Sequence, residues 1–245
     1  MGKVLVLVGA MAASIALVGT ALATHAWGNY HWARTTNPFA LKLGDNVNST
    51  WDSYLRTTSS DWSQSAVLDT TIVAGKGRKN CRPTAGQIEV CNGTYGNNGW
   101  LGIAQIWASG DHITQAATKV NDTYFNTTTY NSSAWRNLVM CQEVGHDFGL
   151  SHQDENFSNP NLGTCMDYTN NPSSNQHPNQ HDYDQLALIY AHLDSSTTIA
   201  SAPAALPGNA PPFSHASRAN GDLYMDDLGN GTRRITHVFW TPFGE

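Results

Sequence analysis

The sequence predicts an α+β protein, because a series of strand segments comes first and the two longest helical segments follow. Residues Val67–Val73 are largely β-branched and apolar, which is typical of a strand. Leu101–Trp107 and Ile113–Asn121 also have the composition of strands. Apolar residues then recur at helical spacing from Trp135 to Val144, and again from Tyr183 to Tyr190.

The first half of the chain contains one helix among its strands. Residues 24–37 are expected to be an irregular lead-in. Ser49 or Thr50 can cap a helix that carries Trp51, Tyr54 and Leu55 on one face. We expect Val67–Val73 to be a buried strand. The full set of expected strands is Phe39–Leu43, Val67–Val73, Gln87–Cys91, Leu101–Trp107 and Ile113–Asn121.

The second half begins with a central helix, which Ser132 or Ser133 can cap. Residues 153–182 are rich in Asn, Pro, Ser and Gln and are expected to be loops, and a helix follows at Asp182–His192. Residues 195–212 are rich in Ser, Ala and Pro, as in a linker. Residues 213–245 are expected to form a β-hairpin that turns at 229–231, a Gly-Asn-Gly sequence.

Length, charge and composition restrict the class of protein. The chain has 245 residues, enough for one good-sized domain with accessory segments. Its formal net charge of -6 and the lack of a basic patch argue against nucleic-acid binding. Only 13% of the residues are charged, and Asn, Ser and Thr supply much of the polarity, a pattern that suits an extracellular surface.

The N-terminus has the pattern of a secretory signal peptide. Lys3 precedes an apolar run from Val4 to Leu22, and the small residues Ala21 and Ala23 flank a cleavage site after residue 23. We therefore expect a signal peptide at residues 1–23 and a secreted protein without a membrane contact after cleavage. An uncleaved N-terminal anchor is the alternative, because the run is close to the lower length of a membrane span.

The segment from Val139 to His152 carries the residues with metal chemistry. Gln142 and His146 are four residues apart, so a helix places both on one face, with Glu143 beside them. Gly149 can adopt the left-handed conformation that ends a helix and turns the chain. This turn would bring His152 back toward His146 and Glu143.

This pattern resembles the long motif of the metzincin zinc peptidases, H-E-x-x-H-x-x-G-x-x-H, with Gln142 in the first position. The sequence Cys165-Met166-Asp167-Tyr168 resembles the Met-turn of the same family. The resemblance implies a twisted mixed sheet, an active-site helix and a small C-terminal subdomain. It also implies a catalytic domain over residues 24–194.

The resemblance further implies a role for each motif residue. Zinc (Zn2+) would be held by Gln142, His146 and His152. Glu143 would act as general base and Tyr168 would stabilise the oxyanion, while Met166 would form an apolar floor below the metal. A protein or peptide substrate would add as a strand to Leu101–Trp107, the expected edge of the sheet above the cleft. The protein is expected to be a monomer.

Gln142 leaves three alternatives open, because a neutral amide oxygen is a poorer zinc donor than an imidazole. Gln142 ligates and the chain is an active zinc endopeptidase, or another group such as His177, His181 or Asp147 fills the position. Otherwise the site is inactive, and the chain is an extracellular binding protein of metzincin fold. A surface structural protein that uses its C-terminal hairpin for attachment is a further alternative.

Four cysteines in an exported chain suggest disulfides, for which three pairings exist. We favour Cys81–Cys91, which closes a local loop, and Cys141–Cys165, which ties the motif helix to the Met-turn. The competing role of Cys141 as a zinc ligand is disfavoured, because its side chain points about 100° away from the face of its neighbour Gln142.

Overall fold

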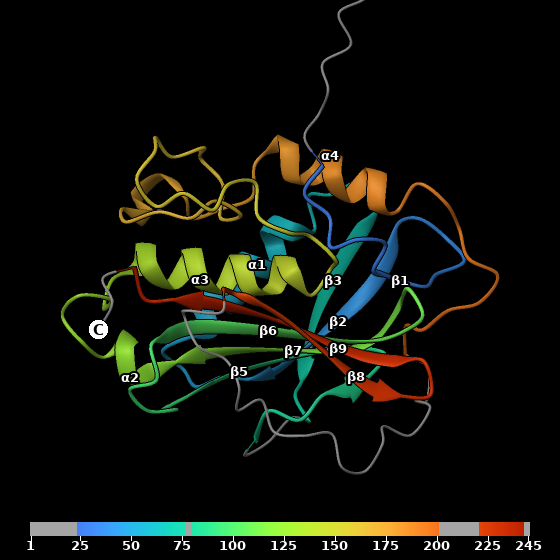
Figure 1. Ribbon diagram of the computed structural model, residues 1–245, viewed down its shortest axis with the longest axis horizontal. Helices are drawn as coiled ribbons and strands as arrows, with labels where there is room; N and C mark the ends of the chain where they lie inside the picture. The colour runs from blue at the N-terminus through green and yellow to red at the C-terminus, as the bar shows by residue number, and fades with distance from the viewer. Residues whose placement is uncertain (1–23, 77–79, 201–220, 243–245) are drawn as a thin grey trace, which may run out of the picture.

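The structure, a computed structural model, describes residues 24–76, 80–200 and 221–242. The predicted signal peptide, most of the predicted linker and the start of the predicted C-terminal extension lie outside the described residues. Figure 1 shows one twisted sheet with α1, α3 and α4 on the same side of it. The α+β prediction is confirmed. No helix among the described residues is long and apolar enough to cross a membrane.

The sheet is mixed and runs in the order β3-β2-β5-β7-β6-β9-β8. In this order, the first four strands (β3, β2, β5 and β7) are parallel to one another. From β7 through β6 and β9 to β8, each strand is antiparallel to the next. Two short strands, β1 and β4, also pair with β7. The strands are β1 His31–Trp32, β2 Phe39–Asn46, β3 Leu68–Ala74, β4 Thr84–Ala85, β5 Ile88–Gly93, β6 Trp100–Ser109, β7 His112–Asn121, β8 Leu223–Gly229 and β9 Thr232–Trp240.

The N-terminal half differs from the prediction in several details. The expected irregular lead-in, residues 24–37, contains strand β1 at His31–Trp32, which pairs with β7. Helix α1 spans Asp52–Trp62, and its N-cap is Trp51, which makes no side-chain cap hydrogen bond. The expected cap at Ser49 or Thr50 is therefore wrong, because the Trp51 ring is drawn into the core, where its Nε1 donates to Asp122 Oδ1 at 2.8 Å. Strand β3 is not a buried strand either, because it lies at the sheet edge and pairs only with β2.

Helix α3, Ser133–His146, lies across the sheet and packs on β6, β7 and β9. Ser132 is its N-cap, and the Ser132 side chain accepts from the backbone N–H of Trp135 at 3.3 Å. Every residue from Leu138 to His146 is buried, because the sheet covers one face of the helix and α1 packs beside it. The motif predicted on this helix therefore lies inside the molecule.

The region after α3 is mostly irregular and holds short helices. It contains a 3-10 helix, η2, at Pro172–Ser174 and α4 at Gln180–Ile189. Helix α4 begins two residues earlier than predicted, because Asn179 and Asp182 form a reciprocal capping box. The remaining helix, α2, is a single turn at Asp122–Phe125.

The C-terminal hairpin is part of the main sheet. β8 and β9 turn through Asn230, and β9 pairs with β6 along almost its whole length. A small apolar cluster holds this pairing from the face opposite α3; its members are Trp100, Ile103, Tyr224, Val238 and Trp240. The expected edge strand at Leu101–Trp107 is therefore wrong, since β6 has β7 on one side and β9 on the other.

Candidate metal centre

The end of α3 brings His146 and His152 together. The chain turns at Gly149, whose φ is +96°, and a Cβ there would lie 2.3 Å from the carbonyl oxygen of Tyr30. Only glycine fits this turn without strain. The Nε2 atoms of His146 and His152 then stand 3.0 Å apart. The turn predicted from the motif spacing places the two imidazoles as expected.

A third imidazole reaches the site from the hairpin. Ile235, His237 and Phe239 alternate along β9 and share the face toward α3. The His237 ring stacks on His146 with centroids 3.9 Å apart and lies 4.5 Å from the His152 ring. One ring nitrogen from each of the three histidines lies within 4.8 Å of the others, and all three residues are buried.

The motif analysis did not identify His237. The signal was nevertheless present in the sequence, because a histidine separates two apolar residues at the inward positions of a predicted strand. What the sequence does not specify is that this strand pairs with β6, more than 120 residues earlier, in the register Ala104–His237. A register shifted by one residue would turn His237 away from the site.

The hydrogen bonds fit a site for a metal ion. His146 donates from Nδ1 to the carbonyl oxygen of Leu150 at 2.8 Å, so its neutral ring presents a bare Nε2. His152 likewise has its Nδ1 near Glu155 Oε1, at 3.4 Å. Neither ring nitrogen of His237 has a hydrogen-bond partner among the described residues. A neutral His237 ring has one lone pair, which a metal ion between the three rings would satisfy.

The charge state fits as well. Burial lowers the pKa of His146 well below its usual range, and the neighbouring His152 lowers it further. Burial also lowers the pKa of His237, again with a contribution from the other two histidines. Neutral imidazoles are the form that binds metal. A set of three imidazoles is one of the ligand sets that zinc uses at catalytic sites.

Gln142 lies on the same helix but is already engaged through its amide nitrogen. Its Nε2 donates to the carbonyl oxygen of Cys165 at 2.7 Å. Its Oε1 is buried and has no hydrogen-bond partner in the described part of the chain. The amide is thus held in one orientation with its oxygen unused, so its role as a ligand stays a prediction.

The alternative donors considered for this position have other partners. His177 lies against Asp61, with Nδ1 and Oδ2 2.7 Å apart. His181 stacks on His25, with ring centroids 4.9 Å apart. Asp147 accepts from Thr118 Oγ1 at 2.7 Å. None of these three side chains belongs to the group of donor atoms around His146 and His152, whereas His237 does.

Glu143 is enclosed between α3 and β6. A Cβ on Gly102 would lie 2.6 Å from Glu143 Oε1, so glycine at this position gives the carboxyl its room. Burial raises the pKa of Glu143 well above its usual range, and Asp147 and Asp222 raise it further, while the backbone N–H of Ala104 acts in the opposite direction. A carboxyl with this environment suits proton transfer.

Tyr168 lies on the other side of His152. The two rings have centroids 4.1 Å apart, and the Tyr168 hydroxyl donates to Asp222 at the start of the hairpin. Burial and the Asp222 carboxylate raise the pKa of Tyr168 well above its usual range, so its hydroxyl keeps its proton. The hydroxyl is therefore a donor, although here it is bound to the hairpin.

Met166 and the Cys141–Cys165 disulfide connect the Met-turn segment to α3. A Cβ on Gly145 would lie 2.7 Å from the Met166 sulfur, so the methionine packs directly under α3. The structure contains the Cys141–Cys165 and Cys81–Cys91 disulfides, the two pairs favoured from the sequence. Because Cys141 is disulfide-bonded, it is not available as a zinc ligand.

The site is closed in this state. Glu143 is 0% exposed, and Gln142, His146 and His237 are also buried. A cavity of about 260 Å³ lies to one side, lined by Tyr168 and Asp222 together with Phe157 and Trp240. The hairpin thus both contributes a donor and covers the site.

No protein-family model matches the chain, and no curated protein does. The solved structures similar to it at low scores include the following two. High choriolytic enzyme 1, a hatching enzyme zinc-protease from Oryzias latipes (medaka fish), has a TM-score of 0.38 and 8% identity, covering 66% of this chain and 94% of that chain. Myroilysin has a TM-score of 0.39 and 13% identity, covering 68% of this chain and 98% of that chain. The assignment of function therefore depends on the residues of the site.

Proposed function

We propose that this chain is a secreted zinc-dependent endopeptidase whose C-terminal hairpin holds it in a closed state. The observation that carries the proposal is the convergence of His146, His152 and His237 beside a buried Glu143. Two disulfides and the signal-peptide pattern at residues 1–23 support export.

Each residue has a chemical task in this proposal. In the closed state His146, His152 and His237 would hold the zinc, which supplies Lewis-acid polarisation of a carbonyl and acidifies water. Glu143 would take a proton from the attacking water at a carboxylate oxygen and deliver it to the leaving amine nitrogen. Tyr168 would donate from its hydroxyl to the oxygen of the scissile carbonyl once that hydroxyl is free of Asp222.

The hairpin determines access to these groups. An extended peptide binds a sheet edge by adding a strand, and β9 occupies the only such position beside β6 in the described sheet. A peptide or protein substrate therefore needs β9 to move away from β6. That movement would also withdraw His237, leaving His146, His152 and the oriented Oε1 of Gln142 as donors.

A second candidate is a metal-binding protein without catalytic activity. The observation that favours it is that the covering strand supplies a donor, so the complete imidazole set and an open cleft exclude each other. In that case zinc would act as a cross-link between α3 and the hairpin, stabilising the folded monomer.

Peptide cleavage by matched variants separates the two candidates. Purified mature protein would be assayed on a mixture of quenched fluorescent peptides, with zinc and with chelator, next to Glu143→Gln and Asp69→Asn. Asp69 is an exposed carboxylate on the edge strand β3, away from the site, so its variant is the control. We expect slow chelator-sensitive cleavage that Glu143→Gln abolishes and Asp69→Asn retains.

Loosening the hairpin completes the experiment. Trp240→Ala removes one of the two tryptophan rings of the small cluster behind β9, and Trp240 is not one of the proposed metal donors. Cleavage should increase if the hairpin causes latency. A protein that binds zinc but cleaves nothing, with or without Trp240→Ala, would support the non-catalytic candidate and contradict the endopeptidase.

A further inference from the structure

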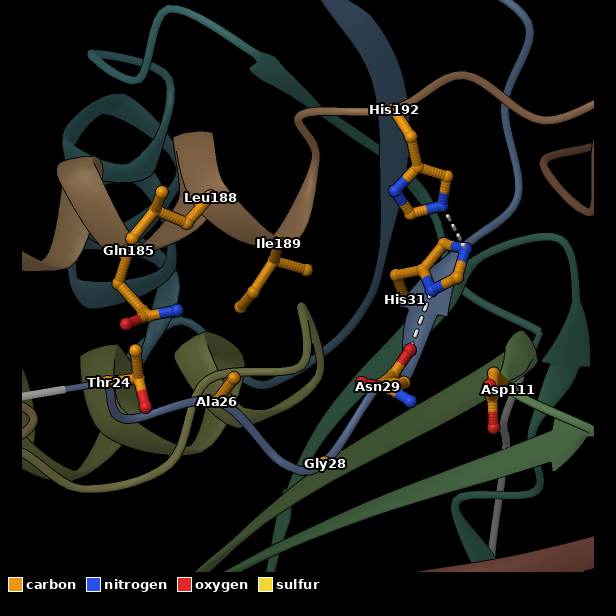
Figure 2. A pocket seen from close by; sticks show the side chains of 10 residues that line it. All are labelled: Thr24, Ala26, Gly28, Asn29, His31, Asp111, Gln185, Leu188, Ile189 and His192. Carbon is orange, nitrogen blue, oxygen red and sulfur yellow. Dashed lines mark hydrogen bonds between the residues drawn. The ribbon is translucent and has the colours of Figure 1, made fainter.

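A second group of histidines lies away from α3. His31 is on β1, and His192 and Asp194 follow α4. Figure 2 shows the His31 and His192 rings pointing toward one another beside a cavity of about 490 Å³, which Asp111 and Gln185 also line. This group shares no residue with the site on α3 and plays no part in the function proposed above.

The separations of the donor atoms have the size expected around a metal ion. His31 Nε2 and Asp194 Oδ1 are 3.4 Å apart, His192 Nε2 and the same oxygen are 3.6 Å apart, and the two Nε2 atoms are 3.2 Å apart. Zinc donors lie about 2.0–2.1 Å from the ion, so two tetrahedral neighbours stand roughly 3.3–3.4 Å from each other. The three donor–donor distances here, 3.2, 3.4 and 3.6 Å, lie around this value.

The surrounding hydrogen bonds orient the same atoms toward a common point. His31 Nδ1 lies 2.7 Å from the carbonyl oxygen of Asn29, which can only accept, so the neutral His31 ring presents a bare Nε2. Arg34 binds the other oxygen of Asp194 through its backbone N–H at 3.1 Å and its Nη1 at 3.0 Å. Asp194 Oδ1 is left facing the imidazoles.

Without an ion these atoms are satisfied only in part. An N–H at His192 Nε2 can donate to the bare Nε2 of His31, but that nitrogen still faces the Asp194 oxygen, which only accepts, whereas a cation would bind all three atoms at once. His112 can provide a fourth donor, because its Nε2 lies 3.2 Å from the same Asp194 oxygen. Imidazole nitrogens with one carboxylate suit zinc far better than calcium or magnesium.

We propose that His31, His192 and Asp194 bind a zinc ion, with His112 as the fourth ligand. The ion would join three segments that are distant in sequence: the N-terminal segment with β1, the start of β7 and the chain that follows α4. The His31 and Asp194 side chains are only 7% and 9% exposed and are held by hydrogen bonds, whereas the His112 and His192 side chains are 41% and 55% exposed. The ion can therefore enter from solvent.

Metal counting on matched variants tests this site. Wild type, His192→Ala and His177→Ala would be equilibrated with zinc at a micromolar free concentration and counted by mass spectrometry against protein concentration. His177 is the control because its side chain is also 55% exposed and also lies against a carboxylate, but with no other histidine. We expect His192→Ala to bind one zinc fewer per chain, and His177→Ala to match wild type.

The comparison stands whatever the site on α3 does, because that site is intact in all three proteins. His112→Ala provides the second variant, and it should lower the affinity of the same site for zinc. Cobalt substitution adds a spectroscopic readout, since a four-coordinate site gives strong visible absorption that His192→Ala should remove. Equal zinc content in wild type and His192→Ala would overturn the proposal.

Discussion

Replacing His237 by phenylalanine should separate metal binding from packing. The His237 ring stacks on both Trp27 and His146, with centroid distances of 4.3 and 3.9 Å, and a phenyl ring can fill the same space. Its two nitrogens have no hydrogen-bond partner among the described residues. Phenylalanine therefore removes a metal donor and an unsatisfied polar group in one step.

The two effects on stability have opposite signs. An unsatisfied buried polar group costs about 1–3 kcal/mol, so the metal-free variant should be about 1 kcal/mol more stable than metal-free wild type. Losing even an outer partner of a metal ligand costs about 10–100-fold in affinity, and losing a ligand should cost at least as much. At a free zinc concentration of 100 Kd, wild type gains about 2.7 kcal/mol; a 100-fold weaker site would gain only about 0.4 kcal/mol.

Urea unfolding with chelator and with buffered zinc measures both terms. The experiment is best done in a His192→Ala background, so that an ion at the second histidine group does not contribute. A purely structural His237 would give a variant whose stability changes equally in both buffers. If the variant gains as much from zinc as wild type does, the assignment of His237 as a ligand is wrong.

Three other outcomes follow from the structure. Gly149→Ala should lower the free energy of unfolding by at least about 2 kcal/mol in urea titrations, because the residue has φ +96° and its Cβ would meet the Tyr30 carbonyl. Glu89→Gln should cost roughly 1–3 kcal/mol at neutral pH. Burial raises the pKa of Glu89, but the hydrogen bonds to its carboxylate outweigh burial, so its pKa in the folded protein is lowered. The stabilisation that Glu89 provides is therefore present above a pH of about 4.3 and is lost as the pH falls through the folded pKa. The difference in unfolding free energy between wild type and Glu89→Gln should therefore disappear in acid. Trp240→Ala should speed amide hydrogen exchange in β9, and zinc should slow that exchange in wild type; unchanged rates in both comparisons would argue against coupling between hairpin and metal.

The sequence predicted what local spacing determines. The i, i+4 spacing of Gln142 and His146 and the turn at Gly149 are contained in a short stretch, so the helix, the turn and the approach of His152 could be expected from it. The hairpin could be expected for the same reason, since its turn residues and alternation are local. These features need no information about the rest of the chain.

Features that depend on distant pairing could not be predicted. Apolar, β-branched composition does not distinguish a central strand from an edge strand, so β3 was assigned as buried although only β2 lies beside it. The pairing of β9 with β6 depends on tertiary packing of the cluster around Trp240, which no local pattern specifies. The position of His237 depends on that pairing and was missed with it.

Gln142 and the hairpin are best understood as one adaptation. An amide in place of the first imidazole weakens a three-donor site, and β9 supplies an imidazole to the same space from outside the motif. His237 lies on β9, the strand that pairs with β6. Pairing of β9 with β6 and metal binding are therefore linked, and each must strengthen the other by the same free energy. Zinc would therefore favour the closed state, and an open cleft would have to rely on His146, His152 and the free oxygen of Gln142. If the chain binds zinc as proposed, Gln142 would decide whether the open protein could still hold it.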